Sequence, residues 1–262
     1  MPSANKKTGA ALLCSHGHGN GADPLIGRDQ AKPETLNDGI DYHIDCHKEF
    51  ALRAVREGYV VFVPEHFPFG RRASKPWSPH GHRCLQGLMH AAHWGYTLVG
   101  IRVWEALMGV HFLASLSSAV DPGRIGMVGL SGGGTNTLFA AAIDRRIRVA
   151  AVAGYFNTFH DTLESIEHCI CNVIPGIGTI ADLPDYLGLF APRSLLLIQS
   201  RRDEWFPQRG FEKAFRHLRK IYRVLRAPPS SVETDVFTDS GKYLAHHEFS
   251  HRKVWDFFRK EL

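Results

Sequence analysis

The chain has 262 residues, 44% of them hydrophobic and 22% charged, with a formal net charge of +5. This mixture is typical of a folded globular protein and excludes intrinsic disorder as the main state. No apolar run approaches the roughly 18 residues of a membrane-spanning helix, so we expect no membrane partner. Residues 1–9 contain no apolar stretch before a small-residue cleavage site, so we expect no secretory signal.

The cysteine count and the charge limit the compartment and the partners. There are five cysteines: Cys14, Cys46, Cys84, Cys169 and Cys171. An odd count without a signal peptide predicts free thiols in a reducing cytoplasm. The charge is only mildly basic and no recognised nucleic-acid module accompanies it, so we expect no nucleic-acid partner.

Short apolar runs alternate with helix-like runs, a rhythm that predicts βα units and a mostly parallel sheet covered by helices on both faces. The predicted strands are Ala10 to Ser15, Tyr59 to Pro64, Ile125 to Leu130, Val149 to Gly154, Ser194 to Gln199 and Val232 to Thr238. The predicted helices are Asp45 to Glu57, Gly95 to Ser118, Gly133 to Ile143, Gln208 to Leu225 and His247 to Lys260. We find no linker or repeat, so residues 1–262 are predicted to form a single domain. Two long stretches, Phe67 to Trp94 and Asn157 to Pro192, are expected to be functional or to carry short helices.

The strongest motif is Gly129-Leu130-Ser131-Gly132-Gly133, which follows a predicted strand and opens a predicted helix. This is the context of a G-x-S-x-G nucleophile elbow, in which a tight turn lifts the serine hydroxyl above the strand ends. The phosphate-loop pattern G-x-x-x-x-G-K-[ST] is absent here, so phosphate binding is a weak alternative.

A serine nucleophile needs a base. In enzymes that carry this elbow, the acid and the histidine follow the serine along the chain in the order Ser, Asp, His. Asp203 lies just beyond a predicted strand and is the predicted acid, with Asp161 as the alternative. His247, directly before the last predicted helix, is the predicted base, and His246 and then His251 are the alternatives.

The first predicted strand ends in Ser15-His16-Gly17-His18-Gly19, a glycine-containing loop at the same edge of the sheet. We predict that the backbone N–H groups of His18 and Gly132 form the oxyanion hole. Two histidines two residues apart are weak evidence for a metal. Cys169-Ile170-Cys171 lacks a second cysteine pair, so packing is the favoured interpretation and no metal is predicted.

These motifs resemble those of α/β-hydrolases, specifically the dienelactone hydrolase and acetylxylan esterase-like branch. The resembling segments are residues 16–19, 58–61, 69–72, 121–126, 129–134, 154–158, 168–172, 191–193 and 202–203. Together they run from about residue 10 to the C-terminus. The resemblance implies the α/β-hydrolase fold and a triad of Ser131, Asp203 and His247, in agreement with the motif analysis.

The sequence departs from that branch at three places. Ser131 stands where strict dienelactone hydrolases use cysteine, and Ala245-His246-His247 replaces the usual Gly-Gly-His. Relatives carry further strands before the oxyanion loop, whereas about nine residues precede the first predicted strand here. Either the sheet lacks those N-terminal strands, which exposes an edge that favours a homo-oligomer, or the start of the coding sequence is misplaced.

The predicted function is hydrolysis of a small-molecule carboxylic ester through an acyl-enzyme, without a cofactor. Five aromatic residues are predicted to line the substrate site: Trp77, Trp94, Tyr155, Trp205 and Phe206. Two alternatives remain open, a peptidase of the prolyl oligopeptidase-like type and a non-catalytic α/β-hydrolase scaffold that acts in binding.

Overall fold

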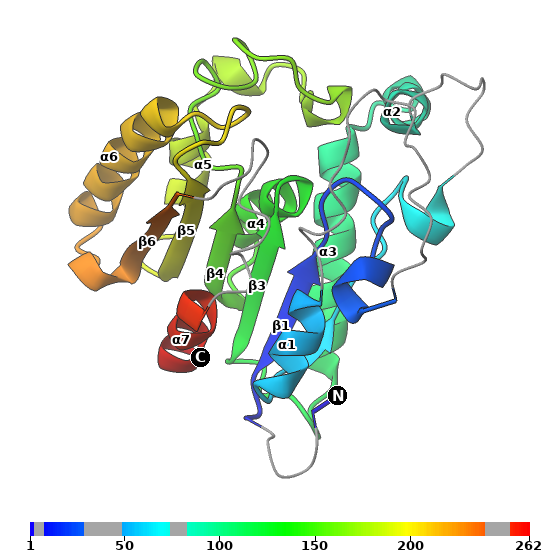
Figure 1. The fold of residues 1–262 in the computed structure, drawn as a ribbon, viewed down its shortest axis with the longest axis vertical. Helices are drawn as coiled ribbons and strands as arrows, with labels where there is room; N and C mark the ends of the chain where they lie inside the picture. Colours follow the sequence, from blue (N-terminus) through cyan, green and yellow to red (C-terminus); the bar gives the residue numbers. More distant parts are fainter. Residues whose placement is uncertain (3–7, 29–48, 74–82, 239–251) are drawn as a thin grey trace.

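The described residues fold around one six-stranded parallel sheet (Figure 1). The computed structural model describes residues 1–2, 8–28, 49–73, 83–238 and 252–262. The strands are β1 (Ala11–Ser15), β2 (Val60–Phe62), β3 (Ile125–Leu130), β4 (Ile147–Ala153), β5 (Ser194–Ser200) and β6 (Val232–Phe237). Every neighbouring pair is parallel, in the order β2-β1-β3-β4-β5-β6. All six predicted strands are therefore confirmed, with ends that differ by at most two residues.

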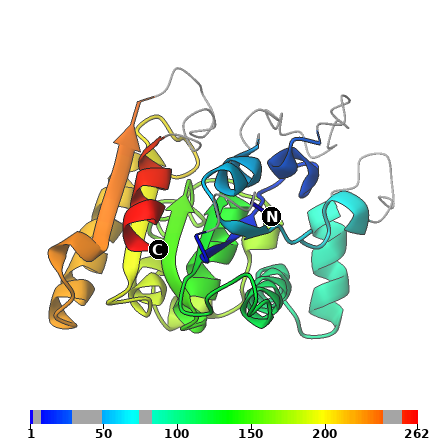
Figure 2. The same cartoon turned by 90° about the horizontal axis from the view of Figure 1, so that it is seen from below.

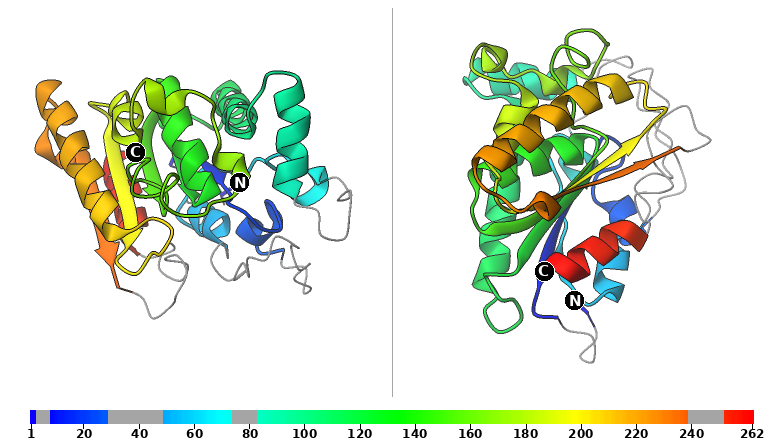
Figure 3. Two further views of the ribbon diagram at one scale, coloured as in Figure 1. Left: turned by 90° about the horizontal axis from the view of Figure 1, so that it is seen from above. Right: turned by 90° about the vertical axis from the view of Figure 1, so that its left-hand side faces the viewer.

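Helices cover both faces of this sheet (Figure 2 and Figure 3). One face packs against α3 (Leu98–Ser115), α4 (Gly132–Ile143), α5 (Leu183–Gly188) and α6 (Gln208–Val224). The other face packs against α1 (Phe50–Arg56) and α7 (Arg252–Glu261). Alternate residues of β1 enter the two cores, Leu13 on the first face and Leu12 on the second, as the two-residue period of a strand requires.

The two long stretches without clear periodicity do contain short helices. Residues 67–94 carry η4 (Gly70–Arg72) and α2 (Arg83–His93), and residues 157–192 carry η5 (Ile170–Asn172), η6 (Ile177–Thr179) and α5. Two further single turns, η2 (Asp23–Ile26) and η7 (Pro229–Ser231), lie in other connections. The first residues of the helix predicted from His247 lie outside the described residues, and α7 is described from Arg252.

The helix α3 corrects the expectation that no apolar run of the chain approaches the length of a membrane-spanning helix. It is long and apolar enough to cross a membrane by length and composition. However, one face of it packs against β1, β3 and α4, and the charged residue Arg102 lies buried on it. These contacts are those of a core helix on a sheet.

The parallel arrangement brings the carboxyl ends of all six strands to one edge. In open α/β sheets, ligands bind at this edge because the loops that leave the strands meet there. The segments after β1, β3, β4 and β5 contain most of the predicted site residues, and the functional site is built on them.

Candidate active site

Ser131 lies at a strained turn between β3 and α4. Its φ of 56° and ψ of −119° are rare for a residue with a side chain. The turn is held by a 2.9 Å hydrogen bond from the Ser131 N–H to the Ala153 carbonyl on β4. It also requires glycine nearby, because a Cβ on Gly129 would lie 2.2 Å from the Gly133 carbonyl oxygen. The geometry is that of a nucleophile elbow.

A cavity of about 390 Å³, including its opening, lies above this turn. It is lined by His18, Ser131, Gly132, Tyr155, Glu167, His168, Cys169, Asn172, Trp205 and Phe206. Three of the five predicted aromatic residues, Tyr155, Trp205 and Phe206, are thus at the cavity, and the rings of Tyr155 and Phe206 are 5.2 Å apart.

The two predicted oxyanion residues lie side by side in the cavity wall. A Cβ on Gly132 would lie 3.3 Å from His18 Nδ1, so the loop after β1 rests on the first turn of α4. Backbone N–H groups at the start of a helix point away from the helix and carry partial positive charge. This wall therefore suits an anionic oxygen next to Ser131.

Asp203 is buried at the carboxyl end of β5, behind two cavity residues. Its Oδ1 accepts hydrogen bonds from the N–H groups of Trp205 (3.0 Å) and Phe206 (2.9 Å). The alternative acid, Asp161, is bound elsewhere, because Lys213 Nζ contacts both its oxygens at 2.7 and 2.9 Å. The hydrogen bond from Lys213 lowers the pKa of Asp161. Of the two acids, Asp203 is the one tied to the cavity wall.

Several predicted site residues lie outside the described residues. These are the candidate bases His246, His247 and His251, and the aromatic residue Trp77. The prediction that Trp94 lines the site needs correction: Trp94 is 77% exposed and follows α2 on the surface. The chain turns back at Gly95, which has a φ of +76°, and this turn leaves the indole outside.

His168 lines the cavity although the sequence did not indicate it. Its Nε2 lies 3.1 Å from the Trp205 carbonyl oxygen and 2.7 Å from Thr162 Oγ1. A carbonyl only accepts, so Nε2 carries the proton in this contact. Burial lowers the pKa of His168 and favours the neutral ring. The segment of residues 167–172 thus gives the cavity its polar wall.

A buried Ser-His-Glu chain lies next to the loop after β1. Ser15 Oγ is 2.8 Å from His66 Nε2, and His66 Nδ1 is 3.3 Å from Glu105 Oε2. Both Ser15 and His66 have no exposed surface, and neither lines the cavity. Arg72 Nη1 also contacts Glu105 Oε1, at 2.5 Å. The network resembles a triad in connectivity, but its burial indicates a structural role in fixing the end of β1.

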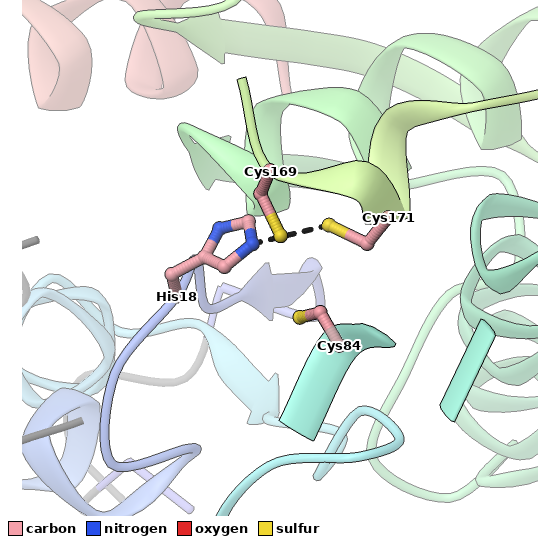
Figure 4. Close-up of side chains that lie close together, drawn as sticks. All are labelled: His18, Cys84, Cys169 and Cys171. Atoms are coloured by element: carbon pink, nitrogen blue, oxygen red, sulfur yellow. Dashed lines mark hydrogen bonds between the residues drawn. The ribbon is translucent and has the colours of Figure 1, made fainter. Parts of the chain in front are cut away.

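One cluster of side chains next to the cavity has the donor atoms of a metal site. His18, Cys84, Cys169 and Cys171 each place one nitrogen or sulfur within 4.8 Å of the others (Figure 4). The sequence alone favours packing for the Cys169–Cys171 pair, because it offers no second Cys-x-Cys pair. The third cysteine comes from α2 and the histidine from the loop after β1, so only the fold brings the four together.

The comparisons with known proteins agree with this architecture. Residues 36–179 match the model of the family described as "Dienelactone hydrolase family". The "Putative hydrolase YtaP" of Bacillus subtilis (strain 168) is 26% identical over 238 residues, which cover 86% of this chain and 74% of YtaP.

Solved structures with the same fold include esterases. A "putative acetyl xylan esterase" from Bacteroides fragilis has a TM-score of 0.69 at 17% identity, over 98% of this chain and 68% of its own. A carbohydrate esterase family 15 glucuronoyl esterase from Caldicellulosiruptor kristjansonii has a TM-score of 0.66 at 17% identity, over 100% of this chain and 71% of its own.

The sheet, the elbow and these matches define an α/β-hydrolase fold. Within that fold the chain belongs to the dienelactone hydrolase family, and it is a hydrolase.

Proposed function

We propose that this protein is a serine esterase that cleaves small carboxylic esters through an acyl-enzyme on Ser131. The observation that carries the proposal is the strained Ser131 backbone at the floor of a cavity, beside His18 and Gly132. Strain of this kind persists where the fold holds a residue for function. Membership of a hydrolase family supports the same reaction class.

The proposed reaction uses one residue from each of three strand ends. His247 takes the proton of Ser131 Oγ, which attacks the ester carbonyl carbon. The backbone N–H groups of His18 and Gly132 bind the oxyanion, and each such donor contributes about 3–4 kcal/mol to the transition state. Collapse expels the alcohol, which takes the proton from His247, and water then hydrolyses the acyl-enzyme by the same steps. Asp203 orients the imidazole and stabilises its cation.

The cavity favours short substrates. Its aromatic wall, formed by Tyr155 and Phe206, suits a small acyl or alkyl group, because apolar surface is removed from water there. Its polar wall, formed by Glu167, His168 and Asn172, offers hydrogen bonds to an oxygen-rich leaving group. Sugar acetates, small aliphatic esters and lactones all meet these requirements.

The test is a panel of p-nitrophenyl acetate, p-nitrophenyl butyrate and a peptide p-nitroanilide, combined with fluorophosphonate labelling. We expect turnover of the acetate, no turnover of the anilide, and labelling at Ser131. Ser131→Ala should abolish both turnover and labelling, whereas Ser15→Ala, the other strand-end serine, should retain labelling.

Other outcomes separate the alternatives. Cleavage of the peptide anilide with efficiency equal to the ester would replace the esterase by a peptidase. If the protein folds but is neither labelled nor active, the non-catalytic scaffold that acts in binding becomes the favoured alternative. Labelling at another serine would show that Ser131 is not the nucleophile.

A further inference from the structure

The cluster of His18, Cys84, Cys169 and Cys171 comes from three separate segments of the chain. His18 lies in the loop after β1 and Cys84 in the first turn of α2, while Cys169 directly precedes η5 and Cys171 lies within it. Figure 4 shows the imidazole and the sulfur atoms directed toward one another, with His18 Nε2 3.1 Å from Cys171 Sγ. His18, Cys84 and Cys171 are buried, and Cys169 is half-buried at the cavity.

The spacing of the donors is close to that of a tetrahedral ion. Zinc bonds of about 2.3 Å to sulfur and about 2.0 Å to nitrogen place neighbouring ligand atoms about 3.5–3.8 Å apart. The four donor atoms here lie within 4.8 Å of one another, so rotamer adjustments of about 1 Å close the shell. Three thiolates with one imidazole form a donor set that favours Zn²⁺ over Mg²⁺ or Ca²⁺.

A buried guanidinium beside the cluster supplies an independent observation. Arg102 Nη2 lies 3.6 Å from Cys84 Sγ, its Nε donates to the Phe67 carbonyl at 2.7 Å, and the group stacks on Phe69 at 4.7 Å. Arg102 is 3% exposed and, among the described residues, forms no ion pair with a carboxylate. A buried charge favours a partner of opposite sign, and within the described part of the chain the cluster sulfur of Cys84 is the group in position to provide it.

With all three cysteines as thiolates, the charges balance when a divalent cation is counted. Three thiolates alone would carry −3 in a buried space, which Arg102 cannot neutralise. Three thiolates, a neutral imidazole and one divalent cation sum to −1, and the +1 of Arg102 makes the assembly neutral. A disulfide between two of the cysteines would instead leave Arg102 facing one remaining thiol.

We propose that His18, Cys84, Cys169 and Cys171 bind one Zn²⁺ ion as a closed structural site. Four protein ligands fill a tetrahedral shell, so the ion keeps no open position for water or substrate. The ion links the oxyanion loop, α2 and the polar cavity wall, which are otherwise distant in sequence. This site does not depend on the reaction proposed for Ser131.

The test begins with the untagged full chain, purified under reducing conditions and analysed for metals by mass spectrometry. We expect about one zinc per chain. After chelation, titration with Co²⁺ should saturate at one equivalent and give the sulfur-to-cobalt charge-transfer band with the intense visible bands of a tetrahedral site. Cys84→Ser should lose the bound zinc and weaken the charge-transfer band. Cys14→Ala, which removes a buried cysteine outside the cluster, should retain both.

A second measurement covers the case in which Cys84→Ser does not fold. In the wild-type protein, a mercurial thiol reagent should release one zinc as it modifies the cluster, detected by a colorimetric zinc indicator. The apparent melting temperature should fall after chelation and return with Zn²⁺ but not with Mg²⁺. Reduced wild-type protein that folds, binds neither zinc nor cobalt and gives the same melting curve with and without chelator overturns the proposal. A Cys84–Cys169 or Cys84–Cys171 disulfide in freshly isolated protein overturns it as well.

Discussion

Gly133 on α4 lies directly against Ser15 at the end of β1, so closely that a Cβ on Gly133 would fall 2.1 Å from the Ser15 carbonyl oxygen. This contact joins the nucleophile elbow to the loop after β1, because Ser131 lies two residues from Gly133 and His18 lies three residues from Ser15. Backbone atoms on both sides leave no side chain that could move away.

Gly133→Ala is therefore expected to lower the free energy of unfolding by about 1–3 kcal/mol, the usual cost of overpacking. Urea unfolding followed by circular dichroism measures this loss. Gly178→Ala is the matched control, because a Cβ there meets nothing within 4 Å. Equal stability of the two variants would show that the contact between β1 and α4 is not as close as described.

Replacing each candidate acid separates catalysis from packing. Asp203→Asn should reduce kcat by about 10⁴-fold, because the base loses its orienting carboxylate. Asp161→Asn should leave kcat unchanged and cost at most about 1 kcal/mol of stability, since its partner Lys213 lies near the surface. Steady-state kinetics with p-nitrophenyl acetate measure kcat for both variants. A larger loss of kcat for Asp161→Asn than for Asp203→Asn would make Asp161 the acid that orients the base.

The base can be identified by single histidine replacements. His247→Ala should abolish turnover and the rise of kcat/KM with pH near the ordinary histidine pKa of about 6.5. His246→Ala should keep both, and His251→Ala serves as a further control. Rates across pH 5 to 9 for the three variants decide between them, and loss of the pH dependence only in His246→Ala would make that residue the base.

The buried Ser15-His66-Glu105 network should make stability depend on pH. Burial by itself raises the pKa of Glu105, but the hydrogen bond and charge of His66, together with Arg72, lower it below its ordinary value of 4.5. Burial lowers the pKa of His66 below 6.5, against the effect of Glu105 and with that of Arg72 and Arg102. In both cases the unfolded chain binds more protons than the folded chain as the pH falls.

Stability should thus decline below pH 6.5 as His66 resists protonation, and decline further below pH 4.5 as Glu105 becomes protonated. Urea unfolding at pH 7.5, 5.5 and 4 tests this. Glu105→Gln should be less stable at pH 7.5 and show a smaller decline below pH 4.5. A decline as steep as that of the wild type would assign the pH dependence to other carboxylates.

The sheet and the elbow were predictable because their signals are local. Strands buried on both faces are near-continuous apolar runs, and the glycines around Ser131 are adjacent in sequence. The α2 helix was not predicted, because its apolar and polar residues do not sort onto separate faces: Gln86 is buried, whereas Leu85 and Met89 are exposed. The α5 helix was missed because its six residues are too short for a period to emerge.

The thiol cluster and the polar cavity wall were beyond reach for a different reason. Cys84 is separated from Cys169 by more than eighty residues, and no spacing rule connects them to His18. The exposure of Trp94 and the inward position of His168 depend on where the connections turn, through Gly95 and through the Trp205 carbonyl. Such features follow from tertiary contacts and cannot be derived from periodicity.

The connection between β4 and β5 supplies five of the ten residues around the cavity, from Tyr155 to Asn172. Ser131 and the two proposed oxyanion donors, His18 and Gly132, come from other connections. If the proposed reaction is correct, the connection between β4 and β5, apart from Cys169 and Cys171, can be varied to change substrate preference without altering the proposed catalytic residues.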